Sequence, residues 1–332
     1  MQEGDSLLDY INLCATSSAS SSSTTSTYET TSLAASGPSR AFGGCTIAAA
    51  LAAASASAPS SFILYSLLGN FLGAATADRI LTCTVRSLRD TRTFATRFVE
   101  VSQLLDNGQR RVCMAALADF QLPEAKDAIL YYYSEQPART YTPADRCPTP
   151  AEQADKMLTM GAMTPQQRQA HHDTKPDMRS RSIEQRYCPE GILGQTLSNV
   201  GGTPLPHTQD ALPMPARTSA DWFRSRQHLS TSAAHRAFLA FVLDGPTGWL
   251  PLLHDQRPLA DFKAVASLEF ALRFFKTDID CNDWHLREIK STAAGEGRTF
   301  FEGKVWDERG RLVASMTQQD IARAKRETLE RL

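Results

Sequence analysis

The pattern that most constrains this chain is a plan that occurs twice, in which one apolar helix precedes a run of alternating strands. The first copy begins with the Ala-rich stretch Cys45 to Ala58, which predicts a helix that ends before Pro59. Ala favours helix and adds little bulk, as suits a helix wrapped closely by a sheet. Alternating apolar and polar residues then predict half-buried strands over Ile80 to Leu88, Thr93 to Gln103 and Arg111 to Gln121.

The second copy repeats this order. The stretch Ala233 to Val242 is apolar on most sides and predicts a buried helix. A duplicated helix and meander implies an α+β fold with antiparallel sheets. The expected strands of this half are Ser182 to Cys188, Ser219 to Gln227, Phe262 to Phe275, Asp283 to Thr292, Arg298 to Asp307 and Leu312 to Ala322.

Composition divides the chain of 332 residues further. The stretch Ala15 to Ser32 is almost entirely Ser, Thr and Ala, so we expect it to be a poorly ordered insertion. A polar stretch rich in Pro, Gln and His reads as a linker with one short helix, Pro150 to Met160. The predicted divisions are a low-complexity N-terminal region at 1–36, a first module at 37–135, the linker at 136–181 and a second module at 182–332.

Charge and cysteine usage exclude several classes of protein. A formal net charge of −1 without a basic stripe argues against nucleic-acid binding. The seven cysteines form no CxxC pair, which favours reduced thiols inside the cell over disulfides or a zinc site. The sequence His171-His172-Asp173 lies in the polar linker, where we read it as solvated surface, so we expect no metal. Pro59 and Asn70 interrupt the apolar run from Cys45 to Ala75 before the roughly 20 residues that a membrane span needs.

The last three residues, Glu330-Arg331-Leu332, resemble the C-terminal peroxisomal address. Arg and Leu fit its last two places, whereas Glu is a poor replacement for the small residue in the first. A charged helix end is the competing interpretation. The peroxisome and the cytoplasm therefore stay open as alternative compartments.

Several short blocks, taken in their order along the chain, resemble one known family. Gly310 to Ser315, followed by Gln318, resembles its closing Gly-Arg-Leu-Val-Ala-Ser-x-x-Gln strand. The family is acyl-CoA thioesterase II, which comprises the double hot-dog thioesterases of bacteria and peroxisomes. Ser267 suits the eukaryotic branch of this family. The other blocks are Phe42-Gly43-Gly44, Leu88-Arg89-Asp90 with Phe94 to Arg97, His235 to Asp244, and Ala266 to Glu269.

The resemblance implies a double hot-dog fold and hydrolysis of an acyl-CoA substrate without a cofactor. It places the catalytic residues at Asp244, Ser267 and Gln318. It also implies a homo-oligomer, by analogy alone. The residues that we expect to bind substrate are Gly43, Gly44, Phe270 and Arg298.

Water attack is the chemistry that these residues suggest. Asp244 could accept a proton from water, while Ser267 and Gln318 hold that water in one orientation. A Ser acyl-enzyme is disfavoured because the sequence has no Gly-x-Ser-x-Gly elbow. Backbone N–H groups at a helix start are the expected oxyanion donors.

The sequence departs from the family pattern near the expected cleft. Glu269-Phe270 stand where Asp-His is usual, Cys45 replaces a common Gln, and Asp320 replaces a common Gly. We therefore expect a specialised acyl group, as in a lipid or secondary-metabolite pathway. Two other functions stay open: a non-catalytic acyl-CoA-binding protein, and a hot-dog hydratase or dehydratase. The latter needs an Asp/His pair on the helix, and His235 lies more than two turns from Asp244.

Overall fold

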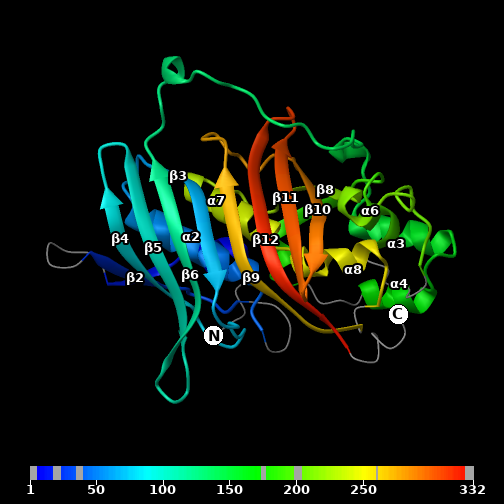
Figure 1. Cartoon of the computed structure of the whole chain (residues 1–332), viewed down its shortest axis with the longest axis horizontal. Helices are drawn as coiled ribbons and strands as arrows, with labels where there is room; N and C mark the ends of the chain where they lie inside the picture. Colours follow the sequence, from blue (N-terminus) through cyan, green and yellow to red (C-terminus); the bar gives the residue numbers. More distant parts are fainter. Residues whose placement is uncertain are drawn as a thin grey trace.

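A single antiparallel sheet organises the molecule. In this computed structural model, which describes residues 6–17, 24–34, 40–172, 177–197, 204–258 and 261–325, twelve strands form one continuous sheet. Their order is β1-β2-β4-β5-β6-β3-β9-β12-β11-β10-β8-β7. Helices α2 (Gly43–Ser57) and α7 (Ser232–Leu243) pack on each other against one face of it (Figure 1).

Twelve strands and eight α-helices succeed one another along the described residues. The strands are β1 (Cys14–Ser17), β2 (Thr25–Glu29), β3 (Ile63–Phe71), β4 (Thr82–Asp90), β5 (Phe94–Leu104), β6 (Arg110–Gln121), β7 (Ile183–Tyr187), β8 (Ser219–Ser225), β9 (Phe262–Phe274), β10 (His285–Gly295), β11 (Arg298–Asp307) and β12 (Leu312–Ala324). The other helices are α1 (Leu7–Ile11), α3 (Pro150–Thr159), α4 (Pro165–His172), α5 (Met178–Ser182), α6 (Ile192–Thr196) and α8 (Leu250–His254).

The predicted duplication is confirmed. After α2 the strands are arranged β4-β5-β6-β3, and after α7 they are arranged β10-β11-β12-β9, which is the same order. The two halves meet where β3 and β9 pair antiparallel, with Leu67 opposite Leu272. The two expected sheets are therefore joined edge to edge, which gives the α+β double hot-dog fold as one long sheet.

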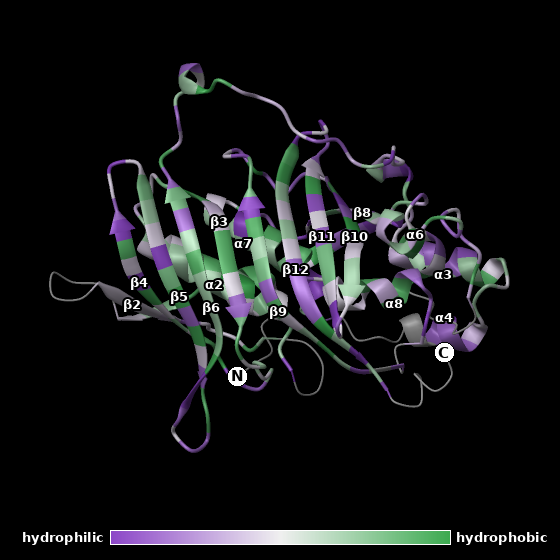
Figure 2. Cartoon of the chain, in the orientation of Figure 1, coloured by the Kyte–Doolittle hydropathy of each residue, from purple (hydrophilic) through white to green (hydrophobic). Residues whose placement is uncertain are grey.

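The central helices are buried because their side chains are small and apolar. Within α2 the residues Cys45 to Leu51 are all buried, and the Ala side chains let the helix lie close to α7. A Cβ atom on Gly44 would lie 2.8 Å from the Phe241 carbonyl oxygen, so only glycine fits at this crossing. The strands alternate hydrophobic and hydrophilic residues along their length (Figure 2). The main core thus fills the space between the helices and the inner face of the sheet.

The N-terminal region corrects one prediction. The stretch from Ala15 to Ser32 was expected to be poorly ordered, but β2 pairs with β4 in antiparallel register and β1 pairs with β2. Thr favours strands because it is β-branched, and the exposed edge of β4 supplies the backbone partners. Thr30 strengthens the attachment, since its hydroxyl accepts a hydrogen bond from the Leu81 backbone N–H at 3.0 Å.

The connection between the halves contains more helix than predicted. The expected helix is α3, and Thr149 and Glu152 form a capping box at its start. Helices α4 and α5 follow it, and the long segment after β6 crosses from one half to the other (Figure 1). Asp173 and the terminal Glu330-Arg331-Leu332 lie outside the described residues.

Membrane-spanning helices and the state of the cysteines can be examined in the described residues. Within the part of the chain described here, no helix is both long and apolar enough to cross a membrane. All seven cysteines fall within that part, and each is a free thiol.

Candidate active site

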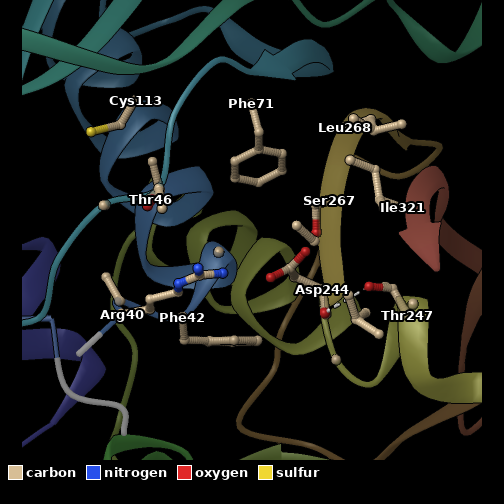
Figure 3. A pocket seen from close by; sticks show the side chains of 18 of the residues that line it. Arg40, Phe42, Thr46, Phe71, Cys113, Asp244, Thr247, Ser267, Leu268 and Ile321 are labelled. Carbon is tan, nitrogen blue, oxygen red and sulfur yellow. Dashed lines mark hydrogen bonds between the residues drawn. The ribbon is translucent and has the colours of Figure 1, made fainter. Parts of the chain in front are cut away.

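A cavity of about 540 Å³ opens where α7 ends beside the start of α2. Asp244 and Ser267 point into it, and Phe42 and Phe71 form apolar walls (Figure 3). Gly43 contributes the start of α2. The cavity therefore combines a carboxylate, a hydroxyl and a helix N-terminus with an apolar surface.

Asp244 is the C-cap residue of α7 and is only 5% exposed. Its Oδ1 atom is buried and has no hydrogen-bond partner among the described residues. Burial, together with the neighbouring carboxyl of Asp320, raises the pKa of Asp244 to about 8. Hydrogen bonds from the Gln318 side chain and the Gly44 backbone, and the charge of Arg179, act in the opposite direction. Asp244 is consequently a far stronger base than an ordinary aspartate.

The two glycines at the start of α2 allow the carboxylate to approach. A Cβ atom on Gly43 would lie 2.7 Å from Asp244 Oδ2. The N-cap residue Phe42 makes no side-chain capping bond, so the first N–H groups of α2 are not satisfied by their own N-cap side chain. The positive end of this helix therefore faces the Asp244 carboxylate.

Gln318 lies behind Ser267 and does not line the cavity itself. It is fully buried, and its Nε2 atom donates to Ser267 Oγ at 2.7 Å and to Thr247 Oγ1 at 2.8 Å. The same nitrogen lies 2.9 Å from Asp320 Oδ1. Gln318 thus orders two hydroxyl groups that lie at the cavity surface.

A β-bulge brings these groups together. Along β12 and β9, Gln319 pairs with Glu269, and the next pair is Asp320 with Ser267. Leu268 is passed over at this irregularity. Without the bulge Asp320 would face Leu268, so one inserted residue on β9 re-aims the Ser267 hydroxyl toward the helices.

The polypeptide after α7 supplies Thr247, in the short 3-10 helix Thr247–Trp249. Its neighbour Gly248 packs against β9 and β12: a Cβ atom there would lie 2.6 Å from Val265 Cγ1 and 3.0 Å from the Cβ atom of Asp320. This close approach places Thr247 against Gln318 and requires a residue without a side chain.

Arg179 of α5 lines the cavity, with its guanidinium carbon 5.2 Å from the centre of the Phe42 ring. Burial and the nearby Arg287 lower the pKa of Arg179. It faces Asp244 closely enough to affect that carboxyl. A segment assigned to the linker therefore contributes a cation to the site.

The predicted residues divide into four groups. Asp244, Ser267 and Gly43 line the cavity, whereas Gln318 and Gly44 contact those residues from behind. Phe270 is buried with its ring 5.7 Å from that of Phe71, so it backs the apolar wall. The structure does not bring Arg298 to this cavity. It begins β11 at the exposed β10–β11 hairpin, where it pairs with Gly295.

Sequence reasoning missed Thr247, Arg179 and Phe71, and it noted Asp320 only as a departure from a family pattern. A signal existed for Asp320, because it lies two residues after Gln318 and must share its face of the strand. No comparable spacing linked Thr247 or Arg179 to β12. Over the described ranges, no cluster of three or more His, Cys, Asp or Glu side chains could hold a metal ion.

A long antiparallel sheet around two central helices, with a carboxylate where the helices meet, defines a double hot-dog protein. Comparison with family models gives the family. Residues 33–121 match the acyl-CoA thioesterase N-terminal domain, and residues 152–321 match the acyl-CoA thioesterase C-terminal domain. The chain therefore belongs to the acyl-CoA thioesterase family, a family of thioester hydrolases.

Individual proteins are similar to this chain over most of its length. Acyl-CoA thioesterase 2 of Haemophilus influenzae is 25% identical over 287 residues, which cover 85% of this chain and 87% of that protein. Acyl-CoA thioesterase II TesB2 of Mycobacterium marinum has a similar structure, with a TM-score of 0.66, 20% identity and coverage of 97% of this chain and 100% of that one. A conserved hot-dog protein of Alicyclobacillus acidocaldarius has a TM-score of 0.61 at 19% identity, covering 96% and 98% of the two chains.

Proposed function

We propose that this protein hydrolyses an acyl-CoA thioester to the free acid and CoA, by attack of a water molecule that Asp244 activates. The observation that carries the proposal is the position of Asp244. Its buried carboxylate lies in the cavity at the junction of α2 and α7, with an oxygen that has no hydrogen-bond partner in the described structure. Membership of the acyl-CoA thioesterase family supplies the substrate class.

In this mechanism Asp244 takes a proton from water as the water oxygen forms its bond to the thioester carbon. The carbonyl oxygen becomes an oxyanion, which the positive end of the α2 dipole would stabilise. Ser267, held by Gln318 at 2.7 Å, orients the water. The C–S bond then breaks, CoA leaves as its thiolate, and the proton on Asp244 can neutralise it.

The acyl group meets an apolar surface made by Phe71 and Leu268, with Phe270 behind it. Gly69 of β3 is also close to this ring, since a Cβ atom there would lie 2.8 Å from Phe270 Cε1. Phe270 therefore occupies the room that a smaller residue would leave open. We infer a specialised acyl substrate, of a lipid or secondary-metabolite pathway, rather than a broad range of fatty acyl groups.

The hydratase alternative is weaker than hydrolysis. Its chemistry would use a histidine with Asp244, but the residues that line the described cavity include none. His235 lies in the first turn of α7, and its Nδ1 atom accepts a hydrogen bond from the Cys281 backbone N–H at 3.1 Å. The other alternative, a protein that binds acyl-CoA without hydrolysing it, retains the same cavity and needs an experiment to separate it.

Release of CoA thiol decides between these functions. Purified protein is mixed with a panel of acyl-CoA esters of different length and branching, and free thiol is followed with a chromogenic disulfide. We expect release with at least one ester at a rate far above the buffer blank. Tight binding of every ester without release would favour the non-catalytic protein and contradict the proposal.

The pH dependence of hydrolysis follows from Asp244. Because only the ionised carboxylate accepts a proton, kcat/KM should rise about tenfold per pH unit up to a pKa of about 8 and then level off. An ordinary aspartate would give a flat profile above about pH 6. Initial rates between about pH 6 and pH 9, corrected for spontaneous hydrolysis, measure this rise of kcat/KM with pH. A flat profile over that range would remove Asp244 as the base.

Substitution of Gly43 by Ala tests the geometry of the carboxylate. The new methyl group would lie 2.7 Å from Asp244 Oδ2, so the carboxylate must shift by several tenths of an ångström. We expect kcat to fall about 10²-fold while the protein remains folded, because small displacements of a catalytic group cost this much. Gly295→Ala is the matched control, since nothing lies within 4 Å of a Cβ atom there. Equal rates for the two variants would contradict the proposed contact.

A further inference from the structure

A second buried carboxylate lies in this site, and the mechanism above does not use it. Asp320 is 1% exposed and faces the helices from β12. Its Oδ1 atom accepts hydrogen bonds from Gln318 Nε2 at 2.9 Å and from Thr247 Oγ1 at 3.4 Å. Its Oδ2 atom is buried without a partner in the described structure. Burying the charge of a second carboxylate in the same site costs free energy. The Asp320 carboxylate should therefore affect the groups around it strongly.

The first consequence concerns the Gln318 amide. A glutamine amide can turn by half a rotation and exchange its donor and acceptor ends, whereas an ionised carboxylate only accepts. Asp320 therefore forces the amide nitrogen toward itself, which also points that nitrogen at Ser267 and Thr247. The two hydrogens of the nitrogen must serve these three acceptors. An uncharged residue at position 320 would leave both orientations of the amide open.

The second consequence concerns which of the two carboxyls keeps its proton to the higher pH. Burial raises the pKa of Asp320, but the neighbouring donors Gln318, Ser267 and Thr247 lower it. Asp244 has fewer such donors, and the charge of Asp320 is the largest cause of its raised pKa after burial. Two buried carboxyls whose charges act on each other cannot both ionise easily. Asp320 is the better stabilised anion, so Asp244 retains the proton to a higher pH.

We propose that Asp320 is a positioning residue of the thioesterase site, which fixes the Gln318 amide toward Ser267 and makes Asp244 the stronger base of the two carboxyls. The inference rests on the proposed function of this site, and it assigns to Asp320 a role that the catalytic set Asp244, Ser267 and Gln318 does not include. The β9 bulge supports it, because the bulge is what sets Asp320 opposite Ser267.

Other charged groups surround the pair and must be considered with it. Arg179 of α5 lowers the pKa of Asp244, and Glu269 of β9 raises that of Asp320. Arg40 lines the same cavity ahead of α2. Cys45 of α2 is a buried thiol whose pKa is raised, so it is neutral. Arg287 of β10 approaches the end of α7, forms an ion pair with Asp221 and acts on Arg179. Asp320 is therefore the neighbour whose removal should change Asp244 most.

The test compares Asp320→Asn with Glu269→Gln, which also removes one negative charge near Asp320 but leaves the hydrogen bonds of the Gln318 side chain to Ser267, Thr247 and Asp320 in place. For Asp320→Asn we expect the rising limb of kcat/KM to move about one unit toward lower pH. We also expect the plateau of kcat to fall roughly tenfold as the Gln318 amide loses its fixed orientation. Glu269→Gln should leave both within error. A profile of Asp320→Asn that superimposes on wild type, or an equal shift in Glu269→Gln, would overturn the inference.

A second readout does not depend on hydrolysis. In protein labelled with carbon-13 at the aspartate carboxyl groups, the Asp244 resonance is identified by its loss in Asp244→Asn and then followed against pH. Its midpoint should fall in Asp320→Asn. If it falls while no ester is hydrolysed, the coupling stands and the proposed function fails. If hydrolysis is found and the midpoint does not move, the function stands and the inference fails. Should Asp320→Asn fold poorly, Asp320→Ser removes the same charge with a smaller side chain.

Discussion

Substitution of Asp244 by Asn is expected to reduce kcat for thioester hydrolysis about 10²- to 10⁴-fold, the usual contribution of a general base. Asn has the same shape and can still accept the hydrogen bond from the Gly44 backbone, but it cannot take a proton from water. The substitution therefore removes the chemistry and leaves the packing. Single-turnover thiol release, compared with wild type at a pH above 8, measures the loss.

Stability provides the internal control for this substitution. The folded-state pKa of Asp244 is raised to about 8, so above its ordinary value near 4 the carboxyl opposes folding. Asn removes that penalty, and we expect equal or higher stability at neutral pH and no gain below about pH 4. Asp106→Asn, at an exposed position of the β5–β6 hairpin, should change neither rate nor stability appreciably. Wild-type hydrolysis in Asp244→Asn would show that the water is activated elsewhere.

Substitution of Arg287 by Met is expected to lower the free energy of unfolding by about 3–5 kcal/mol, because it leaves a buried charge without its partner. Arg287 and Asp221 form a buried ion pair, with Nε 2.9 Å from Oδ1 and Nη2 3.1 Å from Oδ2. The same guanidinium donates to the carbonyl oxygens of Val242 at 2.6 Å and Gly245 at 2.7 Å. It therefore satisfies the end of α7 next to Asp244.

Urea unfolding followed by circular dichroism measures this loss. Arg257→Met is the matched control, since its ion pair with Asp255 is well exposed and worth at most about 1 kcal/mol. Arg287→Lys keeps the charge but loses the bidentate geometry, so we expect an intermediate loss. A change in Arg287→Met no larger than that in Arg257→Met would mean that the Asp221 carboxylate finds another partner.

The local elements of the fold could be predicted because their signals are periodic and short-range. The helix expected from Cys45 is α2, which begins two residues earlier at Gly43, and the strand expected at Arg298 to Asp307 is β11 with the same ends. When apolar and polar residues alternate over ten positions, only a β-strand places all the apolar side chains on one buried face. The sequence of such a segment predicts its conformation, whichever strand or helix the segment packs against in the fold.

The strand β2 could not be predicted in the same way. Its sequence, Thr25–Glu29, has almost no apolar residues, and composition alone suggested an unpacked insertion. What holds it is the free edge of β4, with Tyr28 opposite Cys83. Strand pairing depends on backbone groups that every sequence possesses, so the partner decides whether a polar segment becomes a strand.

The sequence by itself determined the two helices and their meanders, and through a family resemblance it predicted the catalytic candidates Asp244, Ser267 and Gln318. Only the tertiary structure decided how those residues meet. It places Gln318 behind Ser267, adds Thr247 and Asp320, and leaves Arg298 on an exposed hairpin. The physical reason is that a site at the junction of two helices and two strands depends on strand register and close backbone approach. One bulged residue at Leu268 sets which side chains face each other, and no local pattern encodes it.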